Sequence, residues 1–211
     1  RGVNGALAVA DHIRRSTDST RSGSLNTGCT SRHIRGVIPP EGQSDRGKGI
    51  GKFCSSTLLE NNIQIPFPMS HSVHDVAAYI LKKQGEMSAM KLQKLVYYAQ
   101  AWSLVWDEKP LFKAKIEAWA NGPVVRSLYD KHRGQFSVKQ WPEGDRAKIT
   151  GEAKKTIDSV LSFYGDKSGQ WLSELTHKER PWRDARKGLA DDERCDKEIT
   201  HAALAEYYGS L

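Results

Sequence analysis

A strongly apolar stretch lies between Ser88 and Trp106, and its apolar side chains fall on every side of a helix. One stripe repeats at helical spacing and consists of Leu92, Leu95, Val96, Ala99, Trp102 and Trp106. Ser88 is a residue type that caps helix N-termini. Because a helix that is apolar all round belongs in the interior of a domain, the pattern predicts a central core helix here. Lys91 and Lys94 are expected at its more exposed beginning.

Amphipathic patterns on both sides of this stretch predict further helices. Ser72 and Asp75 have the spacing of a capping box, and apolar residues then recur at helical intervals until Gly85. Residues 153–164 place apolar side chains on one stripe and charged side chains outside it, which is typical of a surface helix that ends at Gly165. Three short helices are expected from Ser168 to Leu175, from Pro181 to Lys187, and from Thr200 onward.

The remaining segments predict a small β element. Residues 115–120 alternate polar and apolar positions, as a short strand does. The turn that follows contains Pro123, a residue type tolerated at the first helical position, so we expect a helix from Pro123 to about His132. Residues 135–141 alternate as well, and this second strand is expected to pair with the strand around Trp119. The expected class is mainly α with a small β element (α+β), built around the central hydrophobic helix.

Composition changes sharply near Met69. All six Trp and all seven Tyr follow this residue, whereas residues 1–68 contain nine of the eighteen Gly. A segment so poor in large apolar side chains buries too little surface to offset its ordering entropy. We therefore predict a disordered leader over residues 1–68 and one folded domain over residues 69–211. Because Met69 resembles a natural start, the leader is also considered as sequence outside the native protein.

Charge and cysteine content limit the function classes. Of the net charge of +7, residues 69–211 carry +3, from 23 basic and 20 acidic residues. A domain that is only mildly basic is not typical of a dedicated nucleic-acid binder, so no specific nucleic-acid binding is expected. No membrane-spanning segment or signal-peptide core is predicted. The three Cys are widely separated, which suits a reduced cytoplasm, and we predict a cytoplasmic protein.

Residue types that carry catalysis do not form a recognisable constellation. The sequence has no zinc-binding Cys/His spacing, no HExxH motif and no nucleophile elbow. Residues 47–52 are glycine-rich but lack the spacing of a phosphate-binding loop. His177 is interpreted as a hydrogen-bonding residue at a helix end. We therefore predict no catalytic residues, no metal site and no cofactor, and a protein that is not an enzyme.

A set of ordered short motifs extends from the central helix to the end of the chain. The motifs are Lys91-Leu92-Gln93-Lys94-Leu95, Tyr97-Tyr98-Ala99-Gln100-Ala101-Trp102, Pro110-Leu111-Phe112, Glu117-Ala118-Trp119, Asn121-Gly122-Pro123-Val124, Leu128-Tyr129, Arg133-Gly134, Leu175-Thr176-His177, Pro181-Trp182, Ala185-Arg186, Ile199-Thr200 and Tyr207-Tyr208. Together they resemble the Panacea domain, also called the GepA-like or SocA-like domain. The resemblance covers the chain from Met69 to its C-terminus.

The resemblance implies a binding protein. Panacea-domain proteins are phage-associated proteins and antitoxins of toxin–antitoxin pairs, and some relatives present a toxin to a protease. The leading hypothesis is an antitoxin that neutralises a cognate toxin by direct protein–protein contact. The alternatives are a protease adaptor and a DNA-binding autoregulator that uses the helix from Pro123. Arg126, Arg133 and Arg186 are the candidate partner-binding residues, whereas Trp119 and Gly122 are interpreted as structural.

Overall fold

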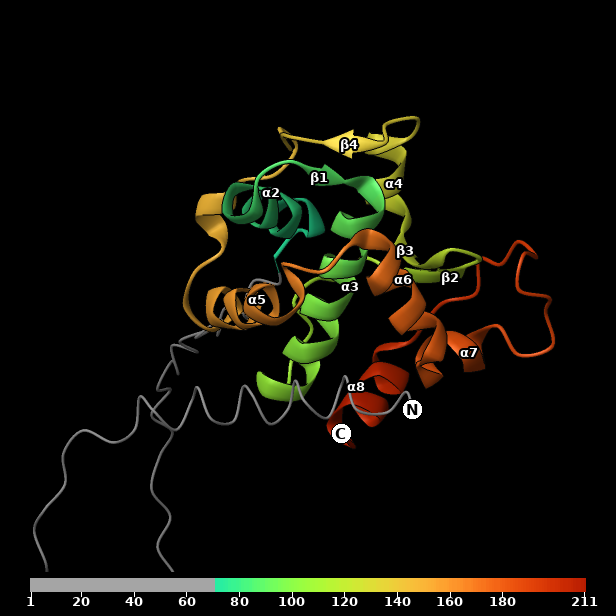
Figure 1. Ribbon diagram of the computed structural model, residues 1–211. Helices are drawn as coiled ribbons and strands as arrows, with labels where there is room; N and C mark the ends of the chain where they lie inside the picture. Colours follow the sequence, from blue (N-terminus) through green and yellow to red (C-terminus); the bar gives the residue numbers. More distant parts are fainter. Residues whose placement is uncertain (1–70) are drawn as a thin grey trace, which may run out of the picture.

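The computed structural model of the protein describes residues 71–211 (Figure 1). The predicted leader and the boundary at Met69 lie outside the described residues, so both stay predictions. The described part is mainly helical with two short antiparallel sheets, which confirms the expected α+β class. The helices are α2 (Val73–Gln84), α3 (Ala89–Trp106), α4 (Arg126–His132), α5 (Gly151–Tyr164), α6 (Gly169–Lys178), α7 (Arg180–Ala185), α8 (His201–Gly209) and the 3₁₀ helix η1 (Arg146–Lys148). The strands are β1 (Met87–Ser88), β2 (Ile116–Trp119), β3 (Gly122–Val125) and β4 (Ser137–Val138).

Helix α3 is the centre of the domain, as its all-round apolar sequence predicts. Figure 1 shows α3 in the middle of the domain, with α2, α5, α6 and α8 packed around it. Leu92, Tyr97 and Tyr98 lie on different sides of the helix, and all three are completely buried. Burial of a large apolar side chain contributes about 1.5–3 kcal/mol, so this helix organises the core.

Helix starts follow the predicted caps. The Ser72 hydroxyl accepts a hydrogen bond from the His74 amide, and the Asp75 carboxylate accepts one from the Ser72 amide, completing the capping box. The hydroxyls at three further helix starts also accept amide hydrogen bonds, at Ser88, Ser168 and Thr200. Each such cap is worth about 1 kcal/mol, because it satisfies an amide that has no partner within the helix.

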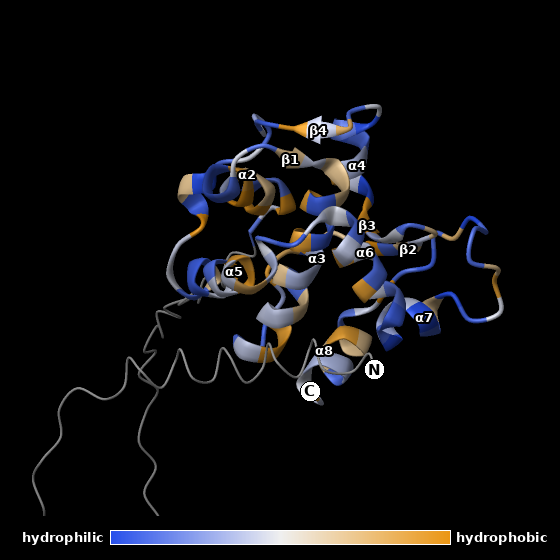
Figure 2. Ribbon diagram, viewed as in Figure 1, coloured by the Kyte–Doolittle hydropathy of each residue, from blue (hydrophilic) through white to orange (hydrophobic). Residues whose placement is uncertain are grey.

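The outer helices are amphipathic in the expected sense. Figure 2 shows the apolar residues of α5 on the side that faces α3 and its hydrophilic residues on the outer side. Ile157 and Val160 of α5 are completely buried, whereas Glu152 and Lys155 are exposed. Among residues 71–211, no helix has both the length and the apolar composition that crossing a bilayer requires.

Strand pairing differs from the prediction. The segment that contains β4 does not pair with the strand around Trp119; β4 pairs with β1, with Met87 opposite Val138. Strand β2 pairs with β3 instead, and Trp119 lies opposite Gly122 in this tight hairpin. Strand β1 has only two residues and directly precedes α3, so the sequence pattern of that helix conceals it.

Pro123 lies in a strand and does not begin a helix, which is a second correction. Helix α4 begins at Arg126, and residues 122–125 form β3. Proline has no backbone N–H group to donate. It is tolerated in an edge strand, because one side of such a strand pairs with no neighbouring strand. The outer edge of β2 is occupied by residues 197–199, because the Ala118 amide donates to the Lys197 carbonyl at 2.9 Å and the Ile199 amide donates to the Ile116 carbonyl at 2.8 Å. Strand β3 therefore stays at the edge.

Candidate functional site

The β2–β3 hairpin, residues 116–125, is attached to α3 by two consecutive polar side chains. The Gln93 amide group binds both backbone groups of Val125: its Oε1 accepts from the Val125 amide at 2.9 Å, and its Nε2 donates to the Val125 carbonyl at 3.3 Å. The Lys94 ammonium group donates to the Pro123 carbonyl at 3.0 Å. These side chains supply the hydrogen bonds that β3 lacks on its free edge, so they fix the strand against the helix.

Helices α6 and α7 hold the other parts of the hairpin backbone. The Ser173 hydroxyl donates to the Asn121 carbonyl at 2.8 Å. The Trp182 indole donates to the Trp119 carbonyl at 2.9 Å, and the Arg186 guanidinium donates to the Ala118 carbonyl at 3.0 Å. Side chains from three helices thus bind the hairpin backbone, and little conformational freedom is left for it to lose on binding a partner.

Lys94 is completely enclosed, contrary to the expectation that it lies at an exposed helix end. It is 1% exposed, and burial lowers the pKa of its ammonium group to about 7. The hairpin closes over it at Gly122, whose φ of +95° favours glycine and where a Cβ would lie 2.6 Å from the lysine nitrogen. The sequence held a signal for this: Lys94 shares a helix face with Tyr97, Tyr98 and Ala101, and all of these are buried.

A pocket of about 400 Å³ adjoins the hairpin, and we call it the hairpin pocket. It is lined by Trp119, Ala120, Asn121, Arg126, Tyr129, Asp130, Arg133, Asp192, Arg194 and Cys195. The rings of Trp119 and Tyr129 meet edge to face with centroids 4.7 Å apart, and both are partly exposed. Trp119 therefore lines an open surface besides packing on the neighbouring helix, which extends its expected structural role.

The charged residues of the hairpin pocket have both signs. Arg126 is half exposed; its guanidinium lies 3.6 Å from the Glu117 carboxylate and 6.0 Å from the centre of the Trp119 ring. Arg133 and Arg194 are exposed at the same pocket, as are Asp130 and Asp192. The structure thus brings two of the three predicted arginines, 126 and 133, to one surface beside aromatic rings.

Arg186, the third predicted arginine, is not on the surface. It is 4% exposed, and its guanidinium donates to the carbonyl groups of Ala118, Ala190, Asp191 and Glu193. It also lies 5.1 Å from the centre of the Trp182 ring. The expectation of an exposed position is therefore wrong: Arg186 fixes the loop over residues 190–193 to the hairpin. Contact of Arg126 and Arg133 with a partner stays a prediction.

A second polar cluster, which the sequence interpretation missed, joins α8 to the core. The Glu179 carboxylate is 2% exposed and accepts hydrogen bonds from the hydroxyls of Tyr208 at 2.7 Å and Tyr98 at 3.2 Å. Burial raises the pKa of Glu179 to about 8. The same burial raises the pKa values of Tyr98 and Tyr208 well above their usual value. The cluster lies inside the core, so we assign it a structural role.

His177 and Cys195, the side chains weighed for chemistry, are placed as follows. The His177 ring stacks on Trp182 at 4.1 Å between centroids, and burial lowers its pKa. Its Nε2 has no hydrogen-bond partner in the described part of the chain, so the interpretation as a hydrogen-bonding residue is wrong for that atom. The Cys195 thiol is free and buried. Within residues 71–211, His, Cys, Asp and Glu form no group of three that would hold a metal ion.

A family model matches the part of the chain that contains the hairpin. Residues 92–183 match the family described as antitoxin SocA-like, Panacea domain. The matched range begins within α3 and ends within α7, so it contains the hairpin, α4 and the side chains of Gln93, Lys94 and Trp182 that hold the hairpin. No curated protein and no solved structure matches the chain. The match confirms the family resemblance that the motifs on α3, the hairpin and α7 carry, and residues 92–183 of the chain are similar to the Panacea domain of antitoxin SocA-like proteins.

Proposed function

We propose that this protein neutralises a cognate toxin protein by direct, stoichiometric binding through the hairpin pocket. The family match supports a role of the toxin–antitoxin type in general. The finer proposal, masking by contact, rests on the site. The hairpin pocket combines arginines and aromatic rings, the residue types that dominate binding energy at protein interfaces.

The proposal rests on one observation: side chains of the surrounding helices hold the backbone of the hairpin in place through hydrogen bonds. Five side chains form hydrogen bonds with carbonyl or amide groups of the hairpin. They are Gln93 and Lys94 of α3, Ser173 of α6, Trp182 of α7, and Arg186 directly after α7. A surface held in this way loses little entropy on association, which favours tight binding. Arg126 and Tyr129 lie on α4, which begins directly after the hairpin, so the fixed hairpin also fixes the positions of these two residues.

The alternative function, DNA binding through α4, receives less support. This alternative required a helix that begins at Pro123, whereas α4 spans only the seven residues from Arg126 to His132. The guanidinium of Arg126 is engaged by Glu117 at 3.6 Å. A recognition helix presents free basic and polar side chains along a longer face. Protein contact is therefore the function that this surface supports best.

The test is co-expression of the full chain with the protein encoded by the adjacent open reading frame, followed by co-purification and a growth assay. We expect a complex of fixed stoichiometry and rescue of growth in proportion to the amount of this protein. The double variant Arg126→Ala/Arg133→Ala should weaken the complex by roughly tenfold or more. The matched control, Lys154→Ala/Lys155→Ala, removes two exposed charges from α5 and should leave the complex intact.

Other outcomes separate the remaining mechanisms. An undiminished complex with the double variant, at wild-type folding, would reject the hairpin pocket as the contact surface. Rescue by trace amounts of this protein, with a chemically modified toxin and no recoverable complex, would indicate an enzyme. Rescue that disappears in a strain lacking an intracellular protease would indicate an adaptor.

A further inference from the structure

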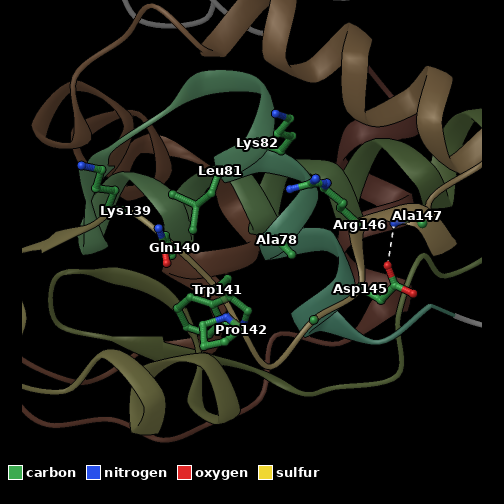
Figure 3. Close-up of a pocket in the computed structure, with 11 residues that line it drawn as sticks. Ala78, Leu81, Lys82, Lys139, Gln140, Trp141, Pro142, Asp145, Arg146 and Ala147 are labelled. Atoms are coloured by element: carbon green, nitrogen blue, oxygen red, sulfur yellow. Dashed lines mark hydrogen bonds between the residues drawn. The ribbon is translucent and has the colours of Figure 1, made fainter.

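A second pocket, of about 600 Å³, lies between α2 and the segment over residues 139–147, and we call it the basic pocket (Figure 3). It is lined by Ala78, Leu81, Lys82, Lys139, Gln140, Trp141, Pro142, Gly144, Asp145, Arg146 and Ala147. The hairpin lies on the other side of α3 in Figure 1, so this pocket is separate from the hairpin pocket. Its volume falls within the range of small-molecule sites, about 300–1,000 Å³.

The wall formed by residues 141–147 is fixed to the first turn of α2. Gly144 approaches the His74 carbonyl so closely that a Cβ would not fit. The Asp145 amide donates to the buried Asp75 carboxylate at 2.7 Å, and the Trp141 indole donates to His74 Nδ1 at 3.1 Å. Three independent contacts therefore define the shape of the pocket in the absence of any ligand.

The basic pocket has an excess of positive charge. Lys82, Lys139 and Arg146 line it, and none of the three forms an ion pair within residues 71–211. By contrast, the neighbouring Lys83 is paired with Asp158 at 3.2 Å. The one carboxylate in the lining, Asp145, already accepts a hydrogen bond from the Ala147 amide at 2.9 Å. The unbalanced charge favours an anionic occupant.

The charges are arranged on two sides of an apolar floor. Figure 3 shows Lys139 on one side and Lys82 and Arg146 together on the other, with Leu81 and Ala78 between them. Leu81 is 4% exposed and Trp141 is 7% exposed, so both side chains are packed into the core beneath the pocket. A ligand that fills this pocket needs an anionic group at each end and an apolar portion between them.

We propose that the basic pocket binds a small organic anion with two anionic groups, carboxylates or phosphates, separated by an apolar portion. Lys139 would bind one anionic group, and Lys82 and Arg146 would bind the other, with the apolar portion over Leu81. Arg146 suits this role because a guanidinium binds a carboxylate or a phosphate through two parallel hydrogen bonds. This site goes beyond the proposed masking of a toxin and does not depend on it.

The test uses the full chain and isophthalate, which carries two carboxylates across one ring, with its neutral analogue isophthalamide as the matched control ligand. A ring that carries two phosphate groups at the same positions forms the second arm and distinguishes the two kinds of anion. Binding is followed by calorimetry and by NMR shifts of the backbone amides. We expect saturable binding of at least one dianion that shifts the amides of residues 139–147, weakens with salt, and is absent for isophthalamide.

Variants assign the binding to the three cations. Lys82→Gln/Lys139→Gln/Arg146→Gln should weaken binding of the dianion by at least about tenfold, since hydrogen bonds to charged groups are lost. Lys154→Gln/Lys155→Gln/Lys187→Gln removes the same charge elsewhere on the surface and should bind as the wild type does. Thermal melts confirm that both variants fold, and the three single variants replace the triple variant if it does not. Absence of saturable binding of either dianion, equal binding of isophthalamide, or equal loss in the control variant would overturn the proposal.

Discussion

At the scale of the residue, two of the buried ionisable side chains, Lys94 and Glu179, have no oppositely charged partner within residues 71–211. Lys94 donates to one carbonyl group, and Glu179 accepts from two tyrosine hydroxyls. Burial moves the pKa of each group toward neutrality, to about 7 for Lys94 and about 8 for Glu179. Near pH 7 the core therefore holds a largely protonated carboxyl and a partly neutral amine, which avoids the cost of two isolated buried charges.

The buried Glu179 contributes stability that is lost progressively as pH rises from about 5 to 7. Its pKa is about 8 in the folded chain and has a usual value of 4.5, so the folded state holds a proton that the unfolded state releases in this range. The slope that one such group contributes is about 1 kcal/mol per pH unit. Glu179→Gln, which stays neutral, should flatten this slope in urea unfolding at pH 5, 6 and 7.

The pH window matters because Lys94 acts in the opposite direction. Its pKa is lowered from 10.5 to about 7, so its contribution to stability rises with pH above 7. Burial also lowers the pKa values of His71, His132 and His177, which act in the same direction as Lys94 within pH 5–7. The difference in slope between the wild type and Glu179→Gln therefore isolates Glu179. Parallel slopes for the wild type and Glu179→Gln would mean that the carboxyl is already ionised in the folded protein.

Trp102 tests the aromatic core at the same scale. It is 1% exposed and lies 4.7 Å from Trp106 and 5.4 Å from Tyr208 between ring centroids. We expect Trp102→Ala to lower the free energy of unfolding by about 3–5 kcal/mol, the usual range for truncation of a large buried aromatic side chain. Denaturant unfolding measures this change in the free energy of unfolding, and Trp171→Ala, a substitution of an exposed Trp, is the control. An unchanged midpoint together with lost partner binding would place Trp102 in the interface.

At the scale of the element, local signals predicted the helices and tertiary contacts decided the strands. Caps at Ser72, Ser88 and Thr200 depend on neighbours within three residues, so the sequence alone located them. The pairing of Met87 with Val138 joins segments about fifty residues apart, and no local pattern carries that information. Pro123 favoured a helix start by local preference, but hydrogen bonds from α3 side chains hold its segment as a strand.

The candidate site was predicted in part for the same reason. Arg126 and Arg133 are exposed, as surface arginines usually are, and the fold brings them to one pocket. Arg186 has the same local appearance in sequence, yet four carbonyl groups surround its guanidinium. Those carbonyls come from β2 and from the loop over residues 190–193, so only the folded chain distinguishes Arg186 from the other two.

Gly122 lies in the hairpin directly against the buried Lys94 side chain, and its substitution gives a prediction at this scale. Gly122→Ala combines an unfavourable φ of +95° with a clash against the Lys94 ammonium group. Gly188→Ala is the matched control, because its φ is +87° and a Cβ there meets open space. We expect the control to cost about 1 kcal/mol from backbone strain and Gly122→Ala to cost clearly more, by urea unfolding. Equal costs would show that Lys94 moves aside freely.

At the scale of the whole molecule, α3 separates two surfaces that differ in charge and in construction. The hairpin pocket contains arginines and aspartates together with two aromatic rings. The basic pocket contains three cations and one carboxylate over an apolar floor. Each wall is fixed by buried polar contacts, Gln93 and Lys94 behind the hairpin and Asp75 behind the basic pocket. The fold therefore presents two preformed surfaces on a single core, and ligands at one need not displace ligands at the other.

The overall charge gives the last prediction, which concerns DNA. Residues 69–211 carry a net charge of +3, and six of their 23 basic residues line two separate pockets. We expect any association with the DNA upstream of its own gene to be loose and to collapse between about 50 and 200 mM salt, because it reflects release of counterions alone. Random DNA of equal length should bind equally well in the same fluorescence-anisotropy titration. Sequence-selective binding that survives about 150 mM salt would contradict this prediction, and its loss in Arg126→Ala/Arg133→Ala would locate the DNA on the hairpin pocket in place of the toxin.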